Sequence, residues 1–113
     1  MNAIVVLVTC ASEKQAGEIS QKLLQQRLAA CVNVVKDVSS LFHWQGKIEA
    51  AHEVLLLIKT RAELFEGVRD CVKAAHSYAN PEIIALPVAA GSSEYLEWIE
   101  QETNPGNLSR RTG

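Results

Sequence analysis

The sequence predicts an α+β fold, and three observations carry that prediction. Four segments are rich in β-branched and aliphatic residues, at 3–9, 30–44, 47–60 and 83–88. One amphipathic helical segment lies between the first and second of them, another between the third and fourth, and a third follows the fourth. Only a turn separates the second from the third. The order β-α-β-β-α-β plus a C-terminal helix is that of the ferredoxin-like, split-βαβ sandwich, in which both crossover helices cover one face of an antiparallel sheet.

The pattern opens with a buried strand and a capped helix. Residues 3–9 are a continuous aliphatic run, as expected for a strand that is covered on both faces. Ser12 then begins a capping box whose third helical position is Gln15. Apolar residues follow at helical spacing, and we expect this helix to end near Arg27.

Two long β-rich arms, at 30–44 and 47–60, form the centre of the pattern. Gln45-Gly46 separates them, and Gly46 can adopt the left-handed conformation that a tight hairpin needs. The arms hold 15 and 14 residues, whereas a usual strand has about five or six. Fully extended at ~3.3 Å per residue, each arm would span about 45 Å, beyond the width of a domain whose radius of gyration is near 13 Å. The hairpin must therefore bend, carry bulges or overhang the domain.

An overhanging apolar hairpin would have open edges, which proteins normally pair or cover. We therefore predict a homo-oligomer in which the hairpin completes the sheet of a neighbour. The alternative is a hairpin that coils back on its own sheet through a bulge near residues 37–40. Trp44, at the hairpin tip, is predicted to anchor the interface, with ligand stacking as its other interpretation. Glu53 lies on the arm that would cross to the neighbour, and it would need a partner if buried.

The second half repeats the alternation of helix and strand. Thr60-Arg61-Ala62-Glu63 predicts another capping box, ahead of an apolar helical stripe. Asn80-Pro81 is a turn signal before the short strand at 83–88. After a glycine break, Ser92 or Ser93 is expected to cap the final helix.

The composition is that of one small globular domain. The chain has 113 residues, 48% of them hydrophobic and 21% charged, which excludes a disordered chain. We place the domain at 1–102 and a polar C-terminal tail at 103–113. A net charge of −2 with scattered lysines predicts no nucleic-acid partner. No apolar run is long enough for a membrane span, and the first residues are more typical of a strand than of a signal peptide, so we expect a cytoplasmic protein without a membrane partner.

No motif in the sequence predicts an enzyme. The three cysteines form no C-x-x-C pair, which argues against a disulfide framework and a structural zinc site. Catalytic triad signatures, a Walker loop, G-x-G-x-x-G and H-E-x-x-H are missing from the sequence, as are paired carboxylates in its apolar segments. We therefore expect no enzymatic activity.

A few residues could still carry chemistry. Cys10 lies just before the first helix, and the dipole of that helix is expected to lower the pKa of the thiol. The thiol could then be a soft copper ligand or a reactive group. The alternative is that Cys10 is a small core residue. His76 ends a helix before a loop with Glu82, and the two could contribute to a copper or zinc site; alternatively the helix dipole favours His76, and Glu82 is hydrogen-bonded at an interface. Lys59 could meet an anion in an intersubunit cleft near Tyr78, or form a structural ion pair.

Motifs of unusual composition run in order from residue 4 to about residue 100. They are Val8-Thr9-Cys10, Gln26-Arg27-Leu28-Ala29-Ala30-Cys31-Val32-Asn33, Trp44-Gln45-Gly46-Lys47-Ile48, Glu53-Val54-Leu55-Leu56-Leu57-Ile58-Lys59-Thr60, His76-Ser77-Tyr78, Pro81-Glu82-Ile83-Ile84-Ala85-Leu86-Pro87 and Tyr95-Leu96-Glu97-Trp98-Ile99. Together they resemble the divalent-cation-tolerance family called CutA.

The resemblance implies a compact homotrimer of ferredoxin-like subunits, similar in shape to the PII signalling proteins. The family is associated with tolerance to copper and other divalent ions, and some members bind copper, so the expected ligand is copper or another divalent cation. Two alternatives stay open: a PII-like signalling module that binds a small anionic effector in intersubunit clefts, and a structural trimeric scaffold for a partner protein. High thermal stability is expected because assembly buries the hairpin.

This chain departs from one bacterial branch of the family at the proposed copper ligands. A cysteine late in the first strand and two adjacent histidines after the second helix correspond here to Val8, Ala75 and His76. Only the last keeps its donor atom. The family also usually has His-Pro-Tyr where this chain has His76-Ser77-Tyr78, and without proline the backbone of that loop is less restricted.

Overall fold

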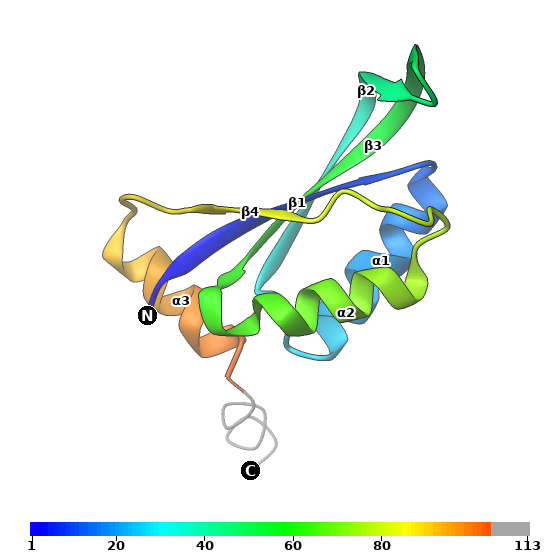
Figure 1. Cartoon of the computed structure of the whole chain (residues 1–113). Coiled ribbons are helices and arrows are strands. Elements are labelled where there is room, and N and C mark those ends of the chain that lie inside the picture. The colour runs from blue at the N-terminus through cyan, green and yellow to red at the C-terminus, as the bar shows by residue number, and fades with distance from the viewer. Residues whose placement is uncertain (105–113) are drawn as a thin grey trace.

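The computed structural model describes residues 1–104, and its elements follow the predicted order (Figure 1). They are β1 (Ala3–Cys10), α1 (Glu13–Gln25), β2 (Cys31–Trp44), β3 (Lys47–Arg61), a 3₁₀ turn (Ala62–Leu64), α2 (Phe65–Ala75), β4 (Ile84–Pro87) and α3 (Ser93–Glu102). None of the helices in this range is both long and apolar enough to span a membrane.

The four strands form one antiparallel sheet in the order β2-β3-β1-β4, which confirms the split-βαβ topology. Helices α1 and α2 lie together on one face of it (Figure 1). The core lies between these helices and the sheet, where Val6 and Val8 of β1 and Leu56 and Ile58 of β3 are fully buried. The alternate side chains of the same strands point to the other face, since successive residues of a strand face opposite ways.

Helix α1 begins as the sequence predicts. The side chain of Ser12 accepts a hydrogen bond from the backbone N–H of Gln15, at 3.2 Å. The helix ends at Gln25, two residues before the predicted boundary. Arg27 has a left-handed backbone, with φ at 58°, so it cannot continue the helix.

The capping box predicted at Thr60 is wrong. Strand β3 continues through Arg61, and Thr60 is a fully buried strand residue that pairs with Ile4 of β1. Its hydroxyl donates to the carbonyl oxygen of Leu28, at 2.7 Å. A distant carbonyl, rather than a local helix N-terminus, therefore takes the hydrogen bond of this side chain.

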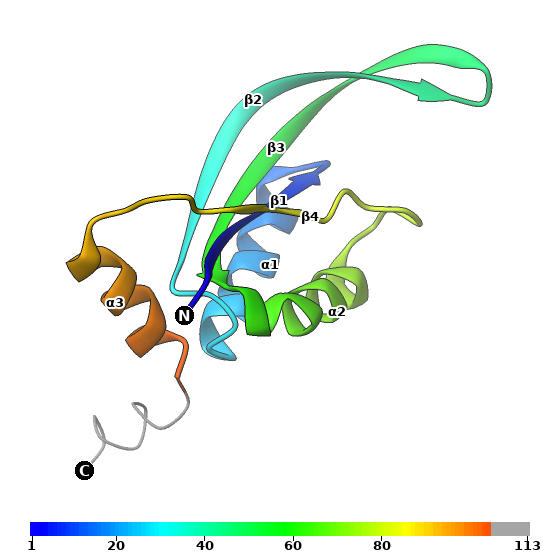
Figure 2. The ribbon, with the colours of Figure 1, turned by 60° about the vertical axis from the view of Figure 1, so that its left-hand side comes forward.

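The hairpin of β2 and β3 both carries a bulge and overhangs the domain. The register shifts between Val35 and Val38, where Asp37 has a φ of 58°. A bulge bends the strand, yet the hairpin does not fold back onto its own sheet: it sweeps out beyond the body of the domain (Figure 2). Leu41 and Ile48 near its tip are 76% and 73% exposed. The predicted overhang is confirmed. The hairpin also contains the bulge that the folded-back alternative required, and this bulge lies at the base of the overhang.

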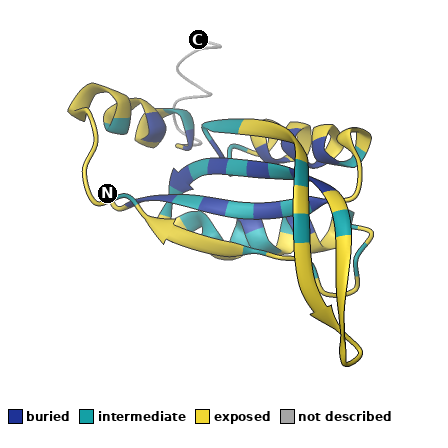
Figure 3. Cartoon of the chain, turned by 90° about the horizontal axis from the view of Figure 1, so that it is seen from above, coloured by how far each residue is buried: buried dark blue, intermediate teal, exposed yellow. Residues whose placement is uncertain are grey.

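Neither α1 nor α2 covers the second face of the sheet. Leu7 faces Leu57 across β1 and β3, and it faces Ile84, which is 52% exposed, across β1 and β4. Figure 3 shows how exposure increases from the body of the sheet along the hairpin and over the edge strand β4. The single chain therefore presents two apolar surfaces, this sheet face and the hairpin.

Helix α3 is fixed to the end of the sheet by two arginines. Arg27 forms an ion pair with Glu102 at 3.0 Å, and Arg61 donates to the side chain of Thr103, also at 3.0 Å. Thr103, the first residue assigned to the polar tail, is itself fully buried. The rest of that predicted tail from residue 105 onward lies outside the described residues.

Candidate functional site

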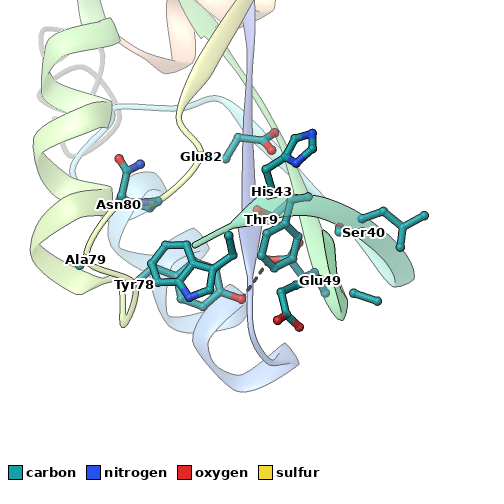
Figure 4. A pocket seen from close by; sticks show the side chains of 14 residues that line it. Thr9, Ser40, His43, Glu49, Tyr78, Ala79, Asn80 and Glu82 are labelled. Atoms are coloured by element: carbon teal, nitrogen blue, oxygen red, sulfur yellow. Dashed lines mark hydrogen bonds between the residues drawn. The ribbon is translucent and has the colours of Figure 1, made fainter. Parts of the chain in front are cut away.

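An open pocket of about 880 Å³ lies between the hairpin and the loop that follows α2. The hairpin passes over this loop in Figure 2, and Figure 4 shows Tyr78, Ala79 and Asn80 on one wall with Ser40, His43 and Glu49 on the other. The full lining is Thr9, Ser40, Leu41, Phe42, His43, Trp44, Glu49, Ala50, Glu53, Tyr78, Ala79, Asn80, Pro81 and Glu82.

Glu53 is the buried acid of this pocket. It is only 8% exposed, and the hydroxyl of Tyr78 donates a 2.9 Å hydrogen bond to its Oε2 (dashed in Figure 4). No lysine, arginine or histidine forms an ion pair with it within residues 1–104. Loss of water, this hydrogen bond and the charge of Glu53 raise the pKa of Tyr78 to about 12. The phenol therefore stays protonated and donates at neutral pH.

His76 holds the loop against the end of β1. It is the C-cap of α2 with an extended backbone, and its Nδ1 accepts a hydrogen bond from the backbone N–H of Tyr78, at 3.0 Å. Nε2 lies 2.7 Å from the carbonyl oxygen of Thr9, so it must carry the proton and donate. The imidazole also contacts the ring of Tyr78, with 4.7 Å between centroids. Both nitrogens of His76 are thus engaged, and neither offers a free lone pair to a metal.

Cys10 is fully buried on the helix-covered face of the sheet. Burial raises the pKa of its thiol to about 11, and the negative charge of Glu53 adds to that rise. The expectation of a lowered pKa is wrong, because the thiol is buried and loss of water disfavours its charged form. Cys10 is a protonated core residue in this structure, which is the second of the two predicted interpretations.

Glu82 lies on the pocket wall that the loop provides. Partial loss of water around its carboxyl raises its pKa, and the charge of Glu53 raises it further. Burial is the main cause of the raised pKa of Cys10, Tyr78 and Glu82, and the charge of Glu53 adds to each rise. Negative charge accumulates here without a cationic side chain from the described part of the chain.

Lys59 does not belong to this pocket. It pairs with Val5 of β1, six residues along β3 from Glu53, or ~20 Å at the usual rise of a strand. Its ammonium group lies 5.7 Å from the ring centroid of Tyr95. One chain therefore does not bring Lys59 and Tyr78 together. Trp44, predicted to anchor an interface, is half-exposed and lines the pocket.

Across residues 1–104, no three histidine, cysteine or acidic side chains converge in a way that could hold a metal ion. The structure brings Glu82 and Glu53 together in the pocket lining, whereas Cys10 lies in the core and does not line the pocket. His76 supports the loop through its two hydrogen bonds. Sequence reasoning missed Glu49, which also lines the pocket. Its signal was its spacing from Glu53: residues four apart on one strand point to the same face.

Comparison with known proteins gives one consistent result. A family profile described as "CutA1 divalent ion tolerance protein" matches residues 4–102. A relative from Thermus thermophilus, "Divalent-cation tolerance protein CutA", is 46% identical over 99 residues, which cover 88% of this chain and 96% of the relative. "Protein CutA" of Homo sapiens is also 46% identical, over 85% of this chain, but the match spans only 54% of that longer protein.

Solved structures agree with the sequence matches. The Thermus thermophilus protein titled "Divalent cation tolerance protein (Cut A1)" superposes with a TM-score of 0.88 at 45% identity, covering 90% of this chain and 99% of that one. CutA1 from Oryza sativa gives a TM-score of 0.90 at 39% identity, covering 93% and 96%. With its fold, motif order and these matches in agreement, the chain belongs to the CutA divalent-cation-tolerance family.

Proposed function

We propose that this chain acts as a homotrimer that handles divalent cations, with copper as the first ion to test. The observation that carries the proposal is Glu53, a carboxylate that is only 8% exposed and whose hydrogen-bond partner within residues 1–104 is the neutral phenol of Tyr78. A buried charge without a counter-ion is costly. A bound cation would offset that cost, and the names of the relatives associate the family with divalent-cation tolerance.

The donors that the pocket offers to such an ion are the carboxylates of Glu53 and Glu82. The remaining ligands would come from water or from another subunit. A metal ion competes with protons for these groups. Binding is therefore expected to weaken as the pH falls, since partial burial raises the pKa of Glu82 in the free protein. His76 supports the loop, and it would become a ligand only by giving up one of its two hydrogen bonds.

Carboxylates suit hard ions, whereas thiolate and imidazole suit copper and zinc. The calorimetric test titrates the tag-free protein with copper(II) and, separately, with zinc(II). We expect saturable binding that Glu53→Gln weakens about tenfold, while the matched control Glu18→Gln, on the exposed face of α1, changes nothing. His76→Ala separates support from ligation: a supporting role predicts a smaller loss than in Glu53→Gln. Equal binding by wild type and Glu53→Gln contradicts the proposed site.

The trimer is supported by the two apolar surfaces of the single chain, the uncovered sheet face and the overhanging hairpin. Monomeric proteins seldom leave such surfaces and strand edges open. Ile48→Lys places a charge on the hairpin where the side chain is 73% exposed and does not line the pocket. We expect light scattering to give the trimer mass for wild type and for the control Leu24→Lys on α1, and a lower mass for Ile48→Lys. A monomeric wild type contradicts the proposal.

No second function is carried by a specific contact. An anionic effector beside Tyr78 would face Glu53 and Glu82, while Lys59 lies at the far end of β3. We further propose a cytoplasmic protein without enzymatic activity, on the sequence grounds given above.

A further inference from the structure

No further inference is drawn: the strongest candidate, the partly exposed cluster of Lys59, Tyr95 and Trp98 where α3 meets the sheet face that α1 and α2 leave uncovered, carries nothing because nothing in the structure shows what covers that face.

Discussion

Replacing Tyr78 by phenylalanine removes the hydroxyl group, whose hydrogen bond in this structure is to Glu53. The hydroxyl donates to Oε2 of Glu53 at 2.9 Å, and Glu53 is 8% exposed. A hydrogen bond to a charged group contributes about 1.5–3 kcal/mol. Because Tyr78 is only half-buried, water can partly replace its hydroxyl. We therefore expect Tyr78→Phe to lower the free energy of unfolding by about 1.5–2 kcal/mol per subunit.

The assay is urea denaturation at a fixed protein concentration, since assembly couples stability to concentration. Tyr95→Phe is the matched control: this ring is also partly exposed, and no hydrogen bond of its hydroxyl is found within residues 1–104. A double-mutant cycle with Glu53→Gln isolates the pair, and the coupling free energy should account for most of the loss in Tyr78→Phe.

A loss of less than about 0.5 kcal/mol in Tyr78→Phe, the usual range for a surface substitution, would contradict this role of the hydroxyl, as would a loss no larger than that of Tyr95→Phe. Either result would mean that Glu53 receives its stabilisation from water or from another subunit. A large loss without coupling to Glu53→Gln would instead assign the effect to packing of the loop.

Three further outcomes can be measured at Tyr78, Cys10 and Thr60. The fold raises the pKa of Tyr78 from 10.0 to about 12, so the phenol loses its proton more readily in the unfolded chain than in the folded one. The free energy of unfolding should therefore fall as the pH rises from about 10 to 12. In Tyr78→Phe, the urea denaturation midpoint should fall less steeply over the same pH range. Cys10, fully buried with a thiol pKa of about 11, should resist alkylation at neutral pH until the protein unfolds, as peptide mass spectrometry would show. Thr60→Val should lower the free energy of unfolding by about 1–3 kcal/mol, measured by urea denaturation, because it leaves the carbonyl of Leu28 without its donor.

Local patterns in the sequence were enough for the architecture. The alternation of strand and helix, the cap at Ser12 and the excess length of the hairpin are all properties of neighbouring residues, and the structure has each of them. Chain geometry required the hairpin to bend, bulge or overhang, because two extended arms of that length exceed the width of a small domain. The structure shows that it both bulges and overhangs. The family motifs were likewise contiguous stretches of sequence.

The pocket depends on contacts that local patterns do not encode. Glu53 and Tyr78 are 25 residues apart in the chain, and Thr9 and His76 are 67 apart. The sequence marked His76 as a candidate ligand, and only the tertiary structure shows that both of its nitrogens are engaged. Glu49 attracted no notice because an isolated acid on a strand is ordinary until a loop folds opposite it.

Thr60 and Cys10 show the physical reason most clearly. Their sequence neighbours predicted a helix cap and a thiol activated by a helix dipole. The fold instead buries both, so the hydroxyl of Thr60 bonds to a distant carbonyl and the thiol of Cys10 keeps its proton. Sequence periodicity determined which elements form and in what order. Hydrogen-bond partners and protonation depend on which groups lose their water, and packing between distant segments decided that.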